Sequence, residues 1–109
     1  MSLVFRVSKM EAEEKILNCG VLELGNAILA LFWEGEEPKL GSTTVTLPGA
    51  ASSQLLGDRD QLLGRIIGAH LSEKYKKISL VSTHLPQGYG ETMGKTLLEM
   101  LRRITEEKS

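Results

Sequence analysis

The chain has 109 residues, of which 41% are hydrophobic and 25% charged, and these proportions are typical of one folded domain. Lysine and arginine number 13 against 14 acidic residues, so no excess of positive charge exists to attract nucleic acid or anionic membranes. The longest strongly apolar run, residues 27–33, is far shorter than the roughly 20 residues that span a bilayer. We therefore expect a single soluble domain over residues 1–109, with neither a nucleic-acid nor a membrane partner.

Two features of the sequence favour a location in the cytoplasm. The N-terminal residues show no basic stretch followed by an apolar segment, so no signal peptide is predicted. Cys19 is the only cysteine and cannot form a disulfide within the chain, which suits a reducing environment. We expect a cytoplasmic protein.

The first half of the chain has the alternating pattern of β-strands. Expected strands cover residues 3–7, residues 14–24 with a bulge near Gly20, and residues 42–47. Between them, residues 27–33 form an uninterrupted apolar run that is typical of a central strand. Because the links are short, these four strands are expected to form an antiparallel meander.

The second half changes to the period of a helix. Asp58 and Gln61 have the spacing of a capping box before a helix over 59–74, whose predicted apolar face is Leu62, Leu63, Ile66, Ile67 and Leu71. A strand over 78–83 follows, and then a second helix that ends near residue 107, with the stripe Met93, Leu97, Leu98, Leu101 and Ile104. The predicted fold class is α+β, a two-layer structure with a mainly antiparallel sheet of five to six strands and two α-helices on one face.

The central strand predicts an interface. One of its sides carries Ala27, Leu29, Leu31 and Trp33, and the other carries Ile28, Ala30 and Phe32, so both faces of the sheet are apolar there. Two helices cover only one face of a sheet. We expect a second copy or a paralogue on the open face, and the candidate interface residues are Ile28, Leu29, Leu31, Phe32, Trp33, Val45 and Val81. The alternative is that loops or the N-terminal strand fold over this face.

Two glycines of the predicted first helix, Gly64 and Gly68, are four residues apart. Each costs about 1 kcal/mol of helix stability relative to alanine, so a close approach of another element is expected there. The sequence leaves open whether that contact lies within the chain or between chains.

A glycine-rich segment over residues 88–96 lies between a strand and a helix, where a phosphate-binding loop would stand. The motif requires a glycine six residues before its lysine, but the residue six before Lys95 is Tyr89. A nucleotide-binding function of this segment is therefore the least favoured hypothesis, and an exposed Lys95 at a helix start is expected.

Other reactive residues show no catalytic pattern. His70 and His84 lie in different predicted elements without cysteine or carboxylate neighbours at ligand spacing, so no metal site is predicted. Cys19 falls inside a predicted strand and is expected to be a small core residue rather than a nucleophile. We predict no catalytic, cofactor-binding or metal-binding residue and no enzymatic activity.

Several short motifs together resemble a known family. They are the strand exit Leu31-Phe32-Trp33-Glu34-Gly35, the loop with Pro38, the strand over 42–47, Ser53-Gln54-Leu55-Leu56-Gly57-Asp58, the strand Ile78-Ser79-Leu80-Val81-Ser82, and a last helix with Leu97, Leu98 and Ile104. Over about residues 14–107 the chain resembles the small proteasome assembly chaperones 3 and 4, and it is most similar to chaperone 4. The segment ending Leu-Leu-Gly-Asp looks like the family's entry to its first helix.

The resemblance implies a non-enzymatic factor that dimerises and binds alpha-type subunits while the outer ring of the proteasome core assembles. Eukaryotic members of the family work as pairs of different paralogues, whereas this chain is also compatible with a self-pairing homologue. The alternative function is another protein–protein interaction or scaffold subunit of small α+β type.

Overall fold

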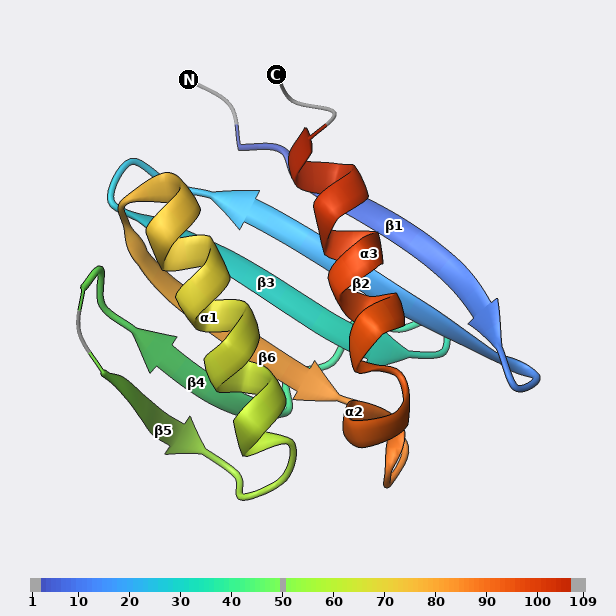
Figure 1. The fold of residues 1–109 in the computed structure, drawn as a ribbon. Coiled ribbons are helices and arrows are strands. Elements are labelled where there is room, and N and C mark those ends of the chain that lie inside the picture. Colours follow the sequence, from blue (N-terminus) through green and yellow to red (C-terminus); the bar gives the residue numbers. More distant parts are fainter. Residues whose placement is uncertain (1–2, 50, 107–109) are drawn as a thin grey trace.

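A single mixed sheet of six strands organises the computed structural model, which describes residues 3–49 and 51–106 (Figure 1). The strands are Phe5–Ala12 (β1), Lys15–Glu23 (β2), Ala27–Glu34 (β3), Ser42–Thr46 (β4), Ser52–Leu56 (β5) and Ile78–His84 (β6). The helices are Gln61–Tyr75 (α1), the short Tyr89–Thr92 (α2) and Gly94–Glu106 (α3). The predicted helix end at residue 107 lies outside the described residues.

The order of strands across the sheet is β1-β2-β3-β6-β4-β5. The first three strands form the expected antiparallel meander, but β6 pairs in parallel with β3 and β4 pairs antiparallel with β6. The prediction of a four-strand meander was therefore wrong, whereas the predicted α+β class with a mainly antiparallel sheet is confirmed. Both β3 and β6 carry apolar residues on their two faces, which suits the centre of a sheet, and the threonine-rich β4 lies further out.

Three local expectations differ from the structure. Gly20 pairs regularly with Val7 and Leu31, and the shift in register lies between Thr43 and Thr44 instead. The strand β5 was not predicted, because its short polar sequence lacks a clear alternation. The helix α1 begins without a capping box.

The start of α1 is set by Asp60. This residue occupies the N-cap position with a left-handed backbone (φ 54°), and its side chain makes no capping hydrogen bond. The carbonyl oxygen of Asp60 accepts a hydrogen bond from the Gly64 amide at 3.0 Å. The Gln61 side chain donates to the carbonyl oxygen of Asp58 at 3.2 Å, so the two residues of the predicted box do interact, but in another geometry.

The helices α1 and α3 lie on the same face of the sheet, and the short α2 lies beyond the end of β6, next to the start of α3 (Figure 1). The helix α1 packs over β4 and β6, and α3 packs over β1 and β2. Between helices and sheet lies a continuous core, which includes Leu17, Cys19, Val21, Ile28, Ala30, Phe32, Leu63, Ile67, Leu71, Val81, Leu97, Met100, Leu101 and Ile104.

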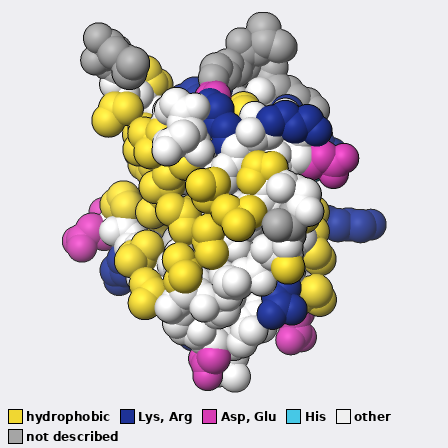
Figure 2. Space-filling model, turned by 90° about the vertical axis from the view of Figure 1, so that its left-hand side faces the viewer, with side chains coloured by type: hydrophobic (Ala, Val, Ile, Leu, Met, Phe, Trp, Pro, Cys, Tyr) yellow, Lys and Arg dark blue, Asp and Glu magenta, His cyan; other side chains and the backbone are white. Residues whose placement is uncertain are grey.

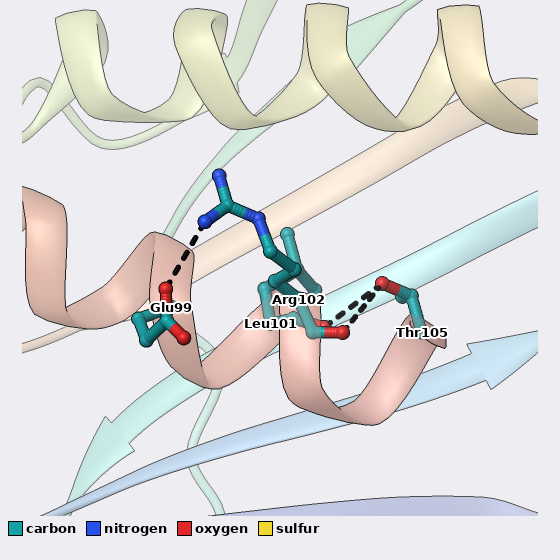
Figure 3. Close-up of polar contacts among 4 residues, drawn as sticks. All are labelled: Glu99, Leu101, Arg102 and Thr105. Atoms are coloured by element: carbon teal, nitrogen blue, oxygen red, sulfur yellow. Dashed lines mark hydrogen bonds and ion pairs between the residues drawn. The ribbon is translucent and has the colours of Figure 1, made fainter. Parts of the chain in front are cut away.

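Polar contacts stabilise the last turns of α3, and one of them joins this helix to β1. The buried Thr105 hydroxyl donates within the helix to the carbonyl oxygens of Leu101 and Arg102, at 3.1 and 3.3 Å, and Arg102 forms an ion pair with Glu99 (Figure 3). The Arg6 guanidinium of β1 donates to the carbonyl oxygen of Ile104 at 3.0 Å. The C-terminal turn of α3 is thereby held against β1.

The contact expected at Gly64 and Gly68 lies within the chain. A Cβ atom on Gly64 would touch the Thr44 hydroxyl and stand 3.1 Å from Thr44 Cβ, and a Cβ on Gly68 would touch the Thr46 hydroxyl. The glycines therefore let α1 approach β4 closely. Next to them, the Ser79 hydroxyl of β6 donates to the Gly68 carbonyl oxygen at 2.9 Å.

Candidate interaction surface

The face of the sheet opposite the helices is covered by no other element of the described chain, and we call it the open face. Residues paired across strands share a face, so the register defines its rows of side chains. One row runs across five strands as Phe5, Leu22, Leu29, Leu80 and Val45. The next row is Val7, Gly20, Leu31, Ser82 and Thr43. The centre of the open face is therefore largely apolar.

Hydrophobic side chains also reach the surface on this part of the molecule. Phe5 and Val7 are each 43% exposed, and the leucines of the first row are half-buried. Figure 2 shows a broad area of hydrophobic side chains on the side of the molecule that lies to the left in Figure 1, with charged side chains at its margins; the open face itself points away from the viewer in Figure 1. A contiguous apolar surface of this kind is typical of a site where another protein binds.

An aromatic pair stiffens one end of the open face. The Phe5 and Trp33 rings are stacked, with centroids 6.3 Å apart and planes inclined by 14°. The Phe5 ring lies directly over Gly20, where a Cβ would collide with it, so the glycine makes room for the ring. Trp33 is only 3% exposed, and its indole N–H has no hydrogen-bond partner among the described residues.

A buried amide lies beside this pair. Asn18 faces the same side as Trp33 and is 1% exposed. Its side-chain nitrogen donates to the carbonyl oxygens of Trp33, at 3.3 Å, and of Gly35, at 2.6 Å. Without these hydrogen bonds the buried amide would lack hydrogen-bond partners and would destabilise the fold. The same hydrogen bonds hold the turn after β3 against β2.

The structure divides the candidate interface residues between the two faces of the sheet. Leu29, Leu31, Val45 and Trp33 belong to the open face, Trp33 beneath the Phe5 ring. Ile28, Phe32 and Val81 point to the helices and are fully buried in the core, so they are not available to a partner in this fold. The two groups lie on opposite faces because successive side chains of a strand point to opposite sides of the sheet.

Four further residues of the open face were not among the candidates: Phe5, Val7, Leu22 and Leu80. The alternation of apolar and polar residues within 3–7 and 78–83 could have indicated three of them, namely Phe5, Val7 and Leu80. Their place beside Leu29 and Leu31 follows only from the strand order, because β6 inserts next to β3.

The reactive residues occupy positions without evident catalytic geometry. Cys19 is buried, and burial raises the pKa of its thiol to about 12, so the thiol is protonated and a poor nucleophile at neutral pH. His70 and His84 are exposed and lie on α1 and β6. Among residues 3–49 and 51–106, no three His, Cys, Asp or Glu side chains gather as a metal site would require.

The glycine-rich segment forms the short helix α2 rather than a loop, and Lys95 is exposed near the start of α3. In the part of the chain that the structure describes, no helix is both long and apolar enough to cross a membrane.

Comparisons with known proteins place this fold. No known protein family matches the sequence, and no curated protein resembles it in sequence. A solved structure does match, a chain of the structure described as "Crystal Structure of a Novel Chaperone Complex for Yeast 20S Proteasome Assembly". The superposition has a TM-score of 0.68 at 15% sequence identity, and it covers 97% of this chain and 94% of that chain. The two chains share a fold. The match extends over nearly the whole of each chain, so all the elements that build the open face fall within it.

Proposed function

We propose that this protein is a non-enzymatic chaperone of proteasome assembly, which pairs with a second copy or a paralogue and binds alpha-type subunits of the proteasome core in the cytoplasm. The open face is the observation that carries the interaction part of this proposal. The shared fold with a chain of a yeast 20S proteasome assembly chaperone complex supports the choice of client.

The pairing step uses the rows of the open face. Two such sheets stacked face to face would enclose the side chains of both rows in a layer about 10 Å thick, as in a β-sandwich. Stable interfaces bury about 800 Å² on each partner. The first row supplies such an interface with one apolar side chain from each of five strands.

The first experiment tests the pairing step by measuring the mass of the protein in solution. We expect about twice the chain mass of 12.0 kDa for the wild type, and the monomer mass for Val7→Asp, which places a charge on the open face. Leu40→Asp is the matched control, since Leu40 is exposed in the loop before β4, and it should keep the wild-type mass. A monomeric wild type at about 100 μM, a concentration far above the dissociation constant of a stable dimer, would contradict pairing with a second copy and leave only a paralogue as the pairing partner.

The second experiment tests the client. The purified protein is mixed with each alpha-type subunit from the source cell, and complexes are detected by gel filtration. Co-elution with at least one subunit is expected. A stable dimer that binds none of the subunits would instead favour the alternative function, a scaffold subunit of another complex, because the open face itself does not specify the client.

A further inference from the structure

A groove opens on the helical side of the molecule, between the first turns of α1 and α3. It has a volume of about 540 Å³ and is lined by Asp60, Gln61, Leu62, Leu63, Ile66, Gly90, Glu91, Gly94, Lys95 and Leu98. The buried Leu63 lines it from α1, and its side chain lies 3.9 Å from the position that a Cβ on Gly94 of α3 would take. The remaining leucine and isoleucine side chains lie along the groove.

The helix α1 has more apolar residues than its packing on the sheet requires. Leu63, Ile67 and Leu71 are buried against the sheet, whereas Leu62 is 72% exposed and Ile66 is 48% exposed. These two exposed residues are four apart, so they form a second stripe that faces the groove. Exposing two large aliphatic side chains on one helix face has no benefit for the folded monomer, because burying each one would stabilise it by about 1.5–3 kcal/mol.

One end of the groove is acidic. The Asp60 side chain rests against Gly90, where any Cβ would collide with its carboxylate, and Glu91 follows directly. Neither carboxylate forms an ion pair with another described residue. Burial raises the pKa of Asp60, Arg59 lowers it, and the charge of Glu91 raises it further. The lining holds two carboxylates against the single ammonium group of Lys95, so its own net charge is negative, and the neighbouring Arg59 offsets part of the Asp60 charge.

We propose that this groove binds an amphipathic helix of another protein, with leucine-like side chains on Leu62, Ile66 and Leu98 and a lysine or arginine beside Asp60 and Glu91. A third helix fits between two neighbouring helices, where an apolar stripe enters a hydrophobic groove. The basic residue is specified by charge complementarity at the acidic end. Nucleic acid and anionic lipid are disfavoured by the same charge.

The groove works independently of the open face. It lies on the helical side of the sheet and the open face on the other, so both surfaces can be occupied at once (Figure 1). The proposal does not rest on the proteasome assignment, because it concerns the chemistry of the partner segment and not its identity.

The test uses a synthetic peptide of about 12 residues, which is about three helical turns. The peptide carries leucines on one face, one arginine beside them, and alanine and glutamine elsewhere, and a second peptide has glutamate in place of the arginine. Fluorescence anisotropy with the full-length protein measures both dissociation constants. We expect the arginine peptide to bind about tenfold more tightly than the glutamate peptide, as one charge-assisted contact would give.

Variants then locate the site. Leu62→Ser should weaken binding of the arginine peptide about tenfold, since it removes an exposed anchor whose loss leaves the fold intact. The double variant Asp60→Asn with Glu91→Gln should abolish the preference between the two peptides, and Leu40→Ser, an exposed leucine outside the groove, should change neither constant.

Three results would overturn the proposal. They are equal affinity for the two peptides, unchanged affinity in Leu62→Ser, and no binding up to about 1 mM, the weak limit of specific recognition. One form of the second result would also identify another occupant. If Leu62→Ser changes the oligomeric state of the protein but not its affinity for the peptide, the groove binds a second copy of this chain and the proposal fails.

Discussion

Substituting Gly64 by alanine should destabilise the protein, although alanine is the better helix former. Alanine in the middle of a helix gains about 1 kcal/mol over glycine. At this position, however, the new Cβ would touch the Thr44 hydroxyl and lie 3.1 Å from Thr44 Cβ. The helix α1 or the strand β4 must therefore move.

The cost of that movement can be worked from the contacts. Forcing an extra methyl group into a packed interior costs about 1–3 kcal/mol. The Thr44 hydroxyl also donates to the side-chain carbonyl of Gln54 at 2.7 Å, and displacing it loses a hydrogen bond of about 1 kcal/mol. With the helix gain subtracted, we expect Gly64→Ala to lower the free energy of unfolding by about 1–3 kcal/mol, or the melting temperature by about 4–8 °C for each kcal/mol.

Urea denaturation at several protein concentrations measures the effect and separates it from changes in association. The control on the same helix is Ala69→Gly, where exposed Ala69 makes helix propensity the main contribution, and a loss of about 1 kcal/mol is expected. In a Thr44→Ala background, the cost of Gly64→Ala should fall by about 1 kcal/mol or more, because the colliding oxygen is gone. If Gly64→Ala instead raises stability by about 1 kcal/mol, the close packing of α1 on β4 is refuted.

Four further predictions concern three residues of β2. Cys19 should react with iodoacetamide only when the fold opens. Alkylation of the native protein at pH 8, followed by mass spectrometry, should therefore be at least about 1000-fold slower than alkylation in urea. Equal rates in the two conditions would argue against the burial of Cys19. The pKa of its thiol is about 12 in the folded state against 9.0 for an ordinary thiol, so the unfolded chain ionises first as the pH rises, and stability should fall above pH 9 by about 1.4 kcal/mol per pH unit. The variant Cys19→Ala should lack that part of the slope in urea titrations. Asn18→Ala should lower the free energy of unfolding by about 2 kcal/mol, because it leaves the carbonyl oxygens of Trp33 and Gly35 without their donor; an unchanged urea midpoint would contradict this. Gly20→Ala should displace the Phe5 ring from Trp33 and shift tryptophan fluorescence to longer wavelength, and an unshifted spectrum would show that the ring does not cover the indole.

Residues with strong periodicity predicted their own environment well. In β3, alternation assigned Leu29 and Leu31 to one face and Ile28 and Phe32 to the other, and the structure places them so. This succeeds because a strand fixes the direction of each side chain through its own backbone, whatever its neighbours are.

The neighbours of each strand were beyond the reach of the sequence. The sequence of residues 27–34 does not indicate that β6, rather than β4, pairs with this strand. Strand pairing depends on all the strands of the sheet, which compete for the same neighbours. The strand β5 exists because β4 offers it a free edge, and its own residues Ser52–Leu56 have little strand character. The sequence thus predicted an open apolar face but not its rows.

The groove was missed for a different reason. Leu62 and Ile66 were assigned to the same helical face as Leu63, Ile67 and Leu71, although five apolar positions make a stripe too wide for one contact with a sheet. The excess width of this stripe indicated that some of its residues do not contact the sheet. Only the structure shows which ones, because Leu62 and Ile66 remain exposed in it.

The position of α3 has a consequence for how the protein is made. Its last turns pack on β1 and β2, and Arg6 donates to the carbonyl oxygen of Ile104, so a segment that is synthesised long after β1 and β2 covers them. Until the ribosome has released that segment, Leu17, Cys19 and Val21 face water on one side of the meander while the open face remains bare on the other. A nascent chain of this topology therefore exposes both faces of its first strands until α3 has been synthesised, and loss of α3 would leave a sheet prone to aggregation.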